Sequence, residues 1–143
     1  MKTKTLLGGV LASALLVACA TTTSPTGRTQ YVGGVSQQQL NQLGEQAFAE
    51  AKHKTPQSRD TRQTAYLGCV VHAVARQLPA PWNQQRWDYA LFENTEANAW
   101  ALPGGKVGVY TGIFKAATNQ DQLAAVVAHE IGHVIARHHD ERI

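Results

Sequence analysis

The chain has 143 residues, of which 43% are hydrophobic and 16% are charged. This ordinary composition fits one globular domain and excludes a fibrous or wholly disordered protein. The formal net charge is +3, but Lys2 and Lys4 lie in a segment that we expect to be removed, and the remainder carries +1. With so small a charge and no basic stripe, we expect no nucleic acid partner.

The N-terminus is typical of an export signal. After Lys2 and Lys4, residues 6–17 form an apolar run that is short for a membrane-spanning helix. We therefore interpret residues 1–18 as a cleaved signal peptide.

The residues around the expected cleavage point resemble the lipobox of bacterial lipoproteins. Small residues precede Cys19, the residue that such proteins lipidate, and Ala20 follows it. The alternative is an ordinary signal with a coincidental cysteine. A lipid on Cys19 would anchor the protein without spanning the membrane. Among lipoproteins, the lack of an acidic residue after the cysteine favours the periplasmic face of the outer membrane.

Residues 19–35 are rich in Thr, Ser, Gly and Pro, so we expect a flexible tether before a domain that covers residues 36–143. Ser36 and Gln39 form a capping-box pattern that predicts a helix fading by Thr55. A second helix is expected over residues 61–78, before two prolines.

Strands are predicted over residues 87–92, 97–102 and 106–110, with a sharp break at Pro103-Gly104-Gly105 and a short helix near residues 113–117. Together with the helices, they predict an α+β fold with a small, mostly antiparallel sheet. Cys69 is the second cysteine, and in an oxidising compartment it is either buried or paired outside this chain.

The last predicted helix runs from Gln120 to about Arg142, with Asn119 as its cap and Gln122 at the third helical position. Residues 123–128 are apolar almost all round, so we expect this helix to be buried.

This helix contains His129-Glu130-Ile131-Gly132-His133. Residues four apart share one helical face, so both imidazoles can reach a single metal ion. Glu130 points about 100° away around the axis and can act as a general base on water. Two imidazoles with an open position suit Zn²⁺, which we expect as the cofactor, with one ion per chain.

A third protein ligand is required, and the sequence leaves two possibilities open. His139 stands ten residues after His129, as in metzincin proteases, but Ala136 replaces the glycine that lets the helix turn back. On an unbroken helix, His139 would lie about 9 Å along the axis from His133. The other possibility is a carboxylate from a later helix, beyond residue 143.

Taken together, the motifs resemble the HtpX/Oma-type zinc metallopeptidases of peptidase family M48, and most closely their LoiP-like lipoprotein members. The matching segments are Asn98-Ala99-Trp100-Ala101-Leu102-Pro103-Gly104-Gly105, Val109-Tyr110-Thr111-Gly112 and residues 128–138. The resemblance implies an incomplete zincin-like domain in which His129 and His133 bind zinc and Glu130 is the catalytic base. It also implies that Asn98 to Gly105 line the substrate cleft, where an extended peptide adds to a strand edge.

In this family the third ligand is a glutamate well downstream of the second histidine, so we expect it beyond residue 143 and expect this polypeptide alone to bind zinc weakly. The implied function is hydrolysis of peptide bonds in misfolded envelope proteins. Two rival hypotheses are a metzincin-like protease that uses His139, and a non-catalytic envelope lipoprotein that acts as a chaperone or assembly factor.

Overall fold

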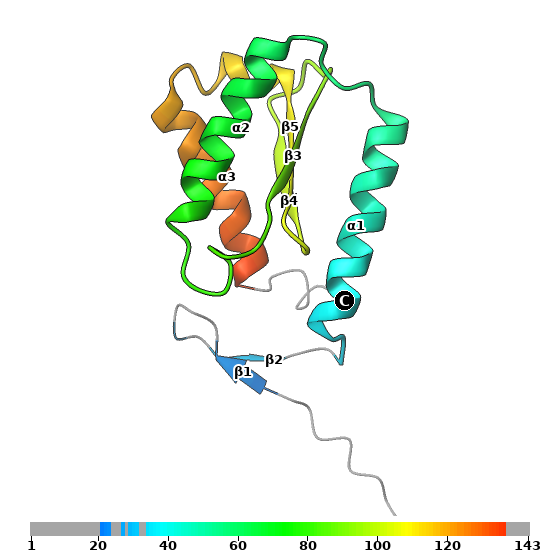
Figure 1. Cartoon of the computed structure of the whole chain (residues 1–143), viewed down its shortest axis with the longest axis vertical. Coiled ribbons are helices and arrows are strands. Elements are labelled where there is room, and N and C mark those ends of the chain that lie inside the picture. The colour runs from blue at the N-terminus through cyan, green and yellow to red at the C-terminus, as the bar shows by residue number, and fades with distance from the viewer. Residues whose placement is uncertain (1–20, 24–26, 28, 32–33, 137–143) are drawn as a thin grey trace, which may run out of the picture.

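The computed structural model describes residues 21–23, 27, 29–31 and 34–136. Three α-helices and a three-stranded sheet make up the main body of the described chain (Figure 1). In chain order, the elements of this body are α1 (Gln37–Lys54), α2 (Thr61–Arg76), β3 (Asp88–Phe92), β4 (Ala99–Leu102), β5 (Lys106–Tyr110), the 3₁₀ helix η1 (Thr111–Lys115) and α3 (Gln120–Ile135).

Each of the three α-helices begins where a side chain satisfies free amides of its first turn. The predicted capping box is confirmed: Gln39 N–H donates to Ser36 Oγ at 3.1 Å, and Ser36 N–H donates to Gln39 Oε1 at 2.9 Å. Asn119 Oδ1 accepts from Gln122 N–H at 2.9 Å, as predicted for α3. Asp60 caps α2, a feature that the sequence analysis did not identify.

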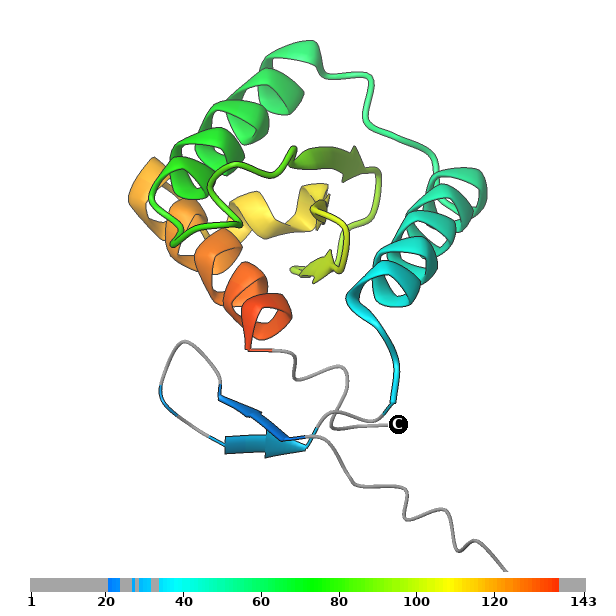
Figure 2. The ribbon, with the colours of Figure 1, turned by 60° about the horizontal axis from the view of Figure 1, so that its bottom comes forward.

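The sheet lies between α1 on one face and α2 with α3 on the other (Figures 1 and 2). Its strand order is β3-β5-β4, so the last of these three strands inserts between the two earlier ones. Consequently β5 pairs antiparallel with β4 through their hairpin but parallel with β3. The α+β class is confirmed, and the sheet is mixed where we had expected mostly antiparallel pairing.

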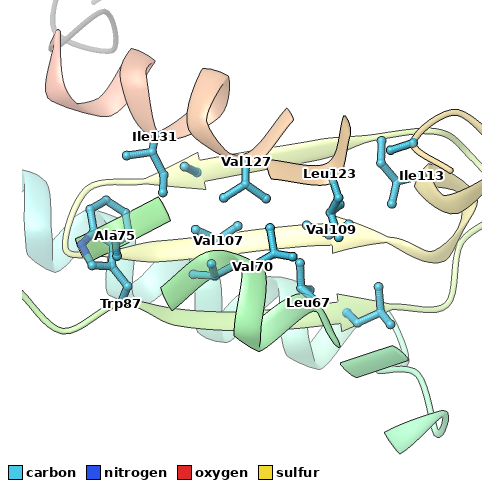
Figure 3. Packing of buried hydrophobic residues seen from close by; sticks show 14 of the residues in the cluster. Leu67, Val70, Ala75, Trp87, Val107, Val109, Ile113, Leu123, Val127 and Ile131 are labelled. Atoms are coloured by element: carbon cyan, nitrogen blue, oxygen red, sulfur yellow. The ribbon is translucent and has the colours of Figure 1, made fainter. Parts of the chain in front are cut away.

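The larger core cluster lies between the sheet and the pair α2 and α3. Leu123 and Val127 of α3 are fully buried and point at Val107 and Val109 of β5, which are also fully buried (Figure 3). Full burial of a side chain of this size contributes roughly 1.5–3 kcal/mol. This packing fixes which face of α3 is turned towards the sheet.

A smaller cluster packs under α1 on the opposite face. Trp100 of β4 meets Phe48 of α1 edge-on at 6.1 Å between ring centroids and stacks on Phe92 at 5.8 Å. Its indole also covers Gly108 of β5, where an added Cβ would lie 2.2 Å from Trp100 Cζ2. Gly108 is therefore required to make room for the indole.

Within the segment that we expected to be a tether, β1 (Thr21–Thr23) pairs antiparallel with β2 (Thr29–Tyr31). The predicted signal peptide and Cys19 lie outside the described residues, and the division of the chain at residues 18 and 35 stays a prediction. Among the helices of the described ranges, none combines the length and the apolar character needed to cross a membrane.

Cys69 is an exposed free thiol on α2. Its burial, one of the two possibilities that we considered, is therefore wrong. The buried stripe of α2 comes from its neighbours Leu67, Val70 and Val71, which turn towards the sheet and leave Cys69 on the outer side.

Candidate metal centre

The histidine-bearing face of α3 is open rather than buried. His129 and Gly132 are exposed, and Glu130 and His133 are half-buried. The expected burial of α3 on all sides is wrong, because the sheet and α2 cover only the opposite face, where Val127 is fully buried. The cost of burying polar groups therefore gives no support for a metal here, and the case depends on geometry.

That geometry brings the two imidazoles to one point. His129 Nε2 lies 3.1 Å from His133 Nε2, and the ring centroids are 4.6 Å apart with the planes at 85°. A tetrahedral metal with 2.0–2.1 Å bonds holds its nitrogen ligands about 3.3 Å apart. The pair is thus spaced to share one ion through Nε2, and these residues fit a Zn²⁺ site.

Helix α3 ends earlier than predicted. Its last residue is Ile135, and Ala136 is the C-cap, whose N–H donates to the carbonyls of Gly132 and Val134. Because Ala136 is already the C-cap, the expectation of an unbroken helix through Ala136 is wrong. His139 lies outside the described residues.

In the described ranges, no third His, Cys, Asp or Glu joins His129 and His133 in a group that could hold a metal ion. These ranges therefore offer two candidate ligands for a zinc site, with Glu130 between them in the sequence.

The predicted substrate strand lies directly beside this helix. Within Asn98 to Gly105, Ala99–Leu102 forms β4, and Ala101 is buried in the core cluster that also contains Ile131 of α3. Asn98 continues the pairing, since its carbonyl accepts from Tyr110 N–H at 2.9 Å. Among the described strands, β4 is an edge strand, so its outer side is open to pairing.

The remainder of that segment forms the turn of the β4–β5 hairpin. Gly104 and Gly105 have φ of +85° and +73°, a region that glycine adopts without strain. The turn packs on α1, where a Cβ on Gly44 would lie 1.9 Å from the Pro103 carbonyl oxygen. Pro103, Gly104 and Gly105 therefore have a structural role, and their contact with substrate stays a prediction.

A charge cluster around the buried Lys106, which the sequence analysis missed, links this hairpin to α1 and β3. Lys106 is only 7% exposed, and its Nζ lies 2.7 Å from Asp88 Oδ2 and 2.8 Å from Glu45 Oε2. Burial lowers the pKa of Lys106, but hydrogen bonds to Asp88 and Glu45 outweigh that effect and leave it raised. The same hydrogen bond from Lys106 lowers the pKa of Asp88. The only signal in the sequence was a lysine at the start of an apolar strand.

Comparison with known proteins agrees with this arrangement. The family model described as Peptidase family M48 matches residues 61–143, more than half of the chain and a range that includes β4 and the histidine pair. The chain belongs to Peptidase family M48. Membership confirms the resemblance drawn from the sequence, although the LoiP-like detail stays a prediction.

Curated relatives carry protease names. The chain is 33% identical over 100 residues to the Beta-barrel assembly-enhancing protease of Escherichia coli, covering 68% of this chain and 20% of that protein. It is 45% identical over 58 residues to Mitochondrial metalloendopeptidase OMA1 of Schizosaccharomyces pombe, covering 41% of this chain and 17% of that protein. Metalloendopeptidase OMA1 of Bos taurus is 29% identical over 105 residues, covering 72% of this chain and 20% of that protein. The chain thus spans about a fifth of the length of these relatives.

Proposed function

We propose that this protein is a zinc-dependent endopeptidase in which His129 and His133 are ligands and Glu130 is the catalytic base. The 3.1 Å convergence of the two Nε2 atoms carries the proposal, because it places both nitrogens within bonding distance of one metal ion. Family membership supports the same reaction. The third ligand is then a side chain outside the described residues.

In this proposal, different residues of the chain transfer the proton and orient the peptide during hydrolysis. Bound Zn²⁺ would supply Lewis-acid chemistry to the scissile carbonyl and the attacking water. Glu130 takes a proton from that water and passes it to the departing nitrogen. The open edge of β4 pairs with the backbone of an extended substrate, which orients the peptide without demanding a particular sequence.

We further propose that Cys19 carries a lipid anchor and that the substrates are misfolded proteins of the bacterial envelope. The lipobox-like residues before Cys19 support the anchor. The name of the Escherichia coli relative associates it with β-barrel assembly, which fits a location at the periplasmic face of the outer membrane.

The decisive experiment compares the full gene product with its Glu130→Gln variant on an unfolded protein substrate. Glutamine keeps the size of the side chain but cannot accept the proton, so we expect peptide hydrolysis to fall at least about 100-fold while zinc content stays unchanged. Hydrolysis at the normal rate would exclude Glu130 as the base.

The same variant separates the rival hypotheses. A non-catalytic chaperone or assembly factor would keep its envelope function with Glu130→Gln, whereas a protease would lose it. Changing His139 to Ala tests the metzincin-like alternative, since it would abolish both zinc retention and hydrolysis only if His139 is the third ligand.

A further inference from the structure

A groove of about 670 Å³ lies on the side of the sheet away from β4, between α1, α2 and the outer edge of β3. Its lining includes Lys52, His72, Arg76, Gln85, Arg86 and Tyr89. A volume of this size is typical of sites for small molecules. Because the histidine pair lies on α3 beside the opposite sheet edge, nothing in the proposed peptidase mechanism uses this groove.

The edge of β3 is open only where the groove lies. Towards its end, the strand is covered by the segment before α2, since Ser58 N–H donates to the Leu91 carbonyl at 2.8 Å. At its start, Asp88 N–H donates inward to the Gly105 carbonyl at 2.8 Å. Because strand residues alternate in direction, the peptide groups of Tyr89 face outward, into the groove.

The charges around the groove do not balance. Asp88 is its only acidic lining residue, and both of its oxygens are occupied: Oδ1 accepts from Arg86 Nε at 3.0 Å and Oδ2 from Lys106 Nζ at 2.7 Å. Lys52 and Arg76 form no ion pair with any carboxylate of the described residues, and Lys52 Nζ instead lies 4.4 Å over the Phe48 ring. The groove therefore presents an uncompensated positive potential.

Arg86 adds further hydrogen-bond donors to the groove. The Arg86 guanidinium donates to Asp88 through Nε alone. Its two terminal nitrogens can therefore donate together, as a fork, to a ligand. Arginine forks and lysine ammonium groups are the side chains that proteins use for phosphate oxygens.

We propose that this groove binds a phosphate group, either free or carried by a lipid headgroup, through Lys52, Arg76 and Arg86. The proposal does not rest on the metal centre, and loss of zinc or of peptidase activity leaves it intact.

The test titrates inorganic phosphate into the full chain and into the variant Lys52→Gln with Arg76→Gln. We expect the variant to bind phosphate at least about tenfold more weakly, since two charge-assisted contacts are lost. The matched control is Lys54→Gln with Arg62→Gln, which removes the same charge from the same two helices outside the groove. The control should bind as the unchanged chain does.

A second arm measures co-sedimentation with phosphatidylcholine vesicles with and without phosphatidylglycerol. If the groove binds headgroups, the preference for phosphatidylglycerol disappears in the groove variant but not in the control. If the groove variant loses phosphate binding alone, the ligand is a free phosphate.

Two outcomes would overturn the proposal: no phosphate or phosphatidylglycerol binding by the unchanged chain, or equal weakening in the groove variant and the control. The exchange Lys52→Arg with Arg76→Lys keeps both charges and should retain binding. It therefore distinguishes loss of a ligand contact from loss of the fold.

Discussion

Lys106 Nζ lies 2.7 Å from Asp88 Oδ2, and this ion pair links the first residue of β5 to the first residue of β3. Glu45 of α1 adds a second carboxylate at 2.8 Å. This cluster sits directly behind the hairpin turn that leads from β4 to β5. It therefore connects the proposed substrate strand to the helix and the strand that support it.

Replacing Lys106 by Met should lower the free energy of unfolding by about 1–3 kcal/mol, because Asp88 is left without its buried partner. Urea denaturation measures the change. The control is Lys54→Met, which breaks an exposed pair with Glu50 whose side chains are 68% and 61% exposed. Equal losses in the two variants would show that the Lys106 cluster contributes no more than a surface pair.

The Asp88 pair should make stability depend on pH at the acid end. Its folded-state pKa lies below the ordinary value of 3.8, chiefly through the hydrogen bond from Lys106. The contribution is therefore fully present above that value and is lost as pH falls through the lowered pKa. The difference in unfolding free energy between the unchanged chain and Asp88→Asn should shrink from about pH 7 to about pH 3. A constant difference would contradict this linkage.

Gly108→Ala should destabilise the protein by about 1–3 kcal/mol, since the new Cβ would lie 2.2 Å from Trp100 Cζ2 between well-packed layers. Near-ultraviolet circular dichroism should show the displaced indole. At Gly132 on α3 an added Cβ meets no atom within 4 Å. Gly132→Ala should therefore stabilise the helix by about 0.5–1 kcal/mol, and destabilisation there would argue against an open face.

Val127→Ala should cost about 2–4 kcal/mol, because Val127 is fully buried against the sheet and truncation leaves a cavity. The adjacent Val126 is half-buried, so Val126→Ala should cost clearly less. Thermal or urea unfolding of both variants would measure the difference. A larger loss at Val126 would mean that α3 is turned differently about its axis.

In the full gene product, His129→Ala and His133→Ala should each reduce bound zinc from about one ion per chain to nearly none, since each removes a ligand. Cys69→Ser is the matched control, because the thiol is exposed on α2 and away from the pair. Metal analysis after dialysis gives the readout. Unchanged zinc in either histidine variant would remove the basis of the metal centre.

Features with local causes could be predicted from the amino-acid sequence alone. The start of α1 at Ser36 and of α3 at Asn119 followed from side chains that bond amides three residues ahead. The β4–β5 turn followed from its two glycines, and the His129 and His133 pairing followed from the 3.6-residue helical repeat.

The other features could not be predicted in this way, because they depend on contacts between segments that are distant in the sequence. The insertion of β5 between β3 and β4 made the sheet mixed, and no local pattern encodes the partner of a strand. Apolar residues run nearly all round α3, but the sheet covers one face alone, so the histidines face outward. Lys106 finds its carboxylates on α1 and β3, far away in sequence, and burial of a charge is tolerable only once such partners are in place.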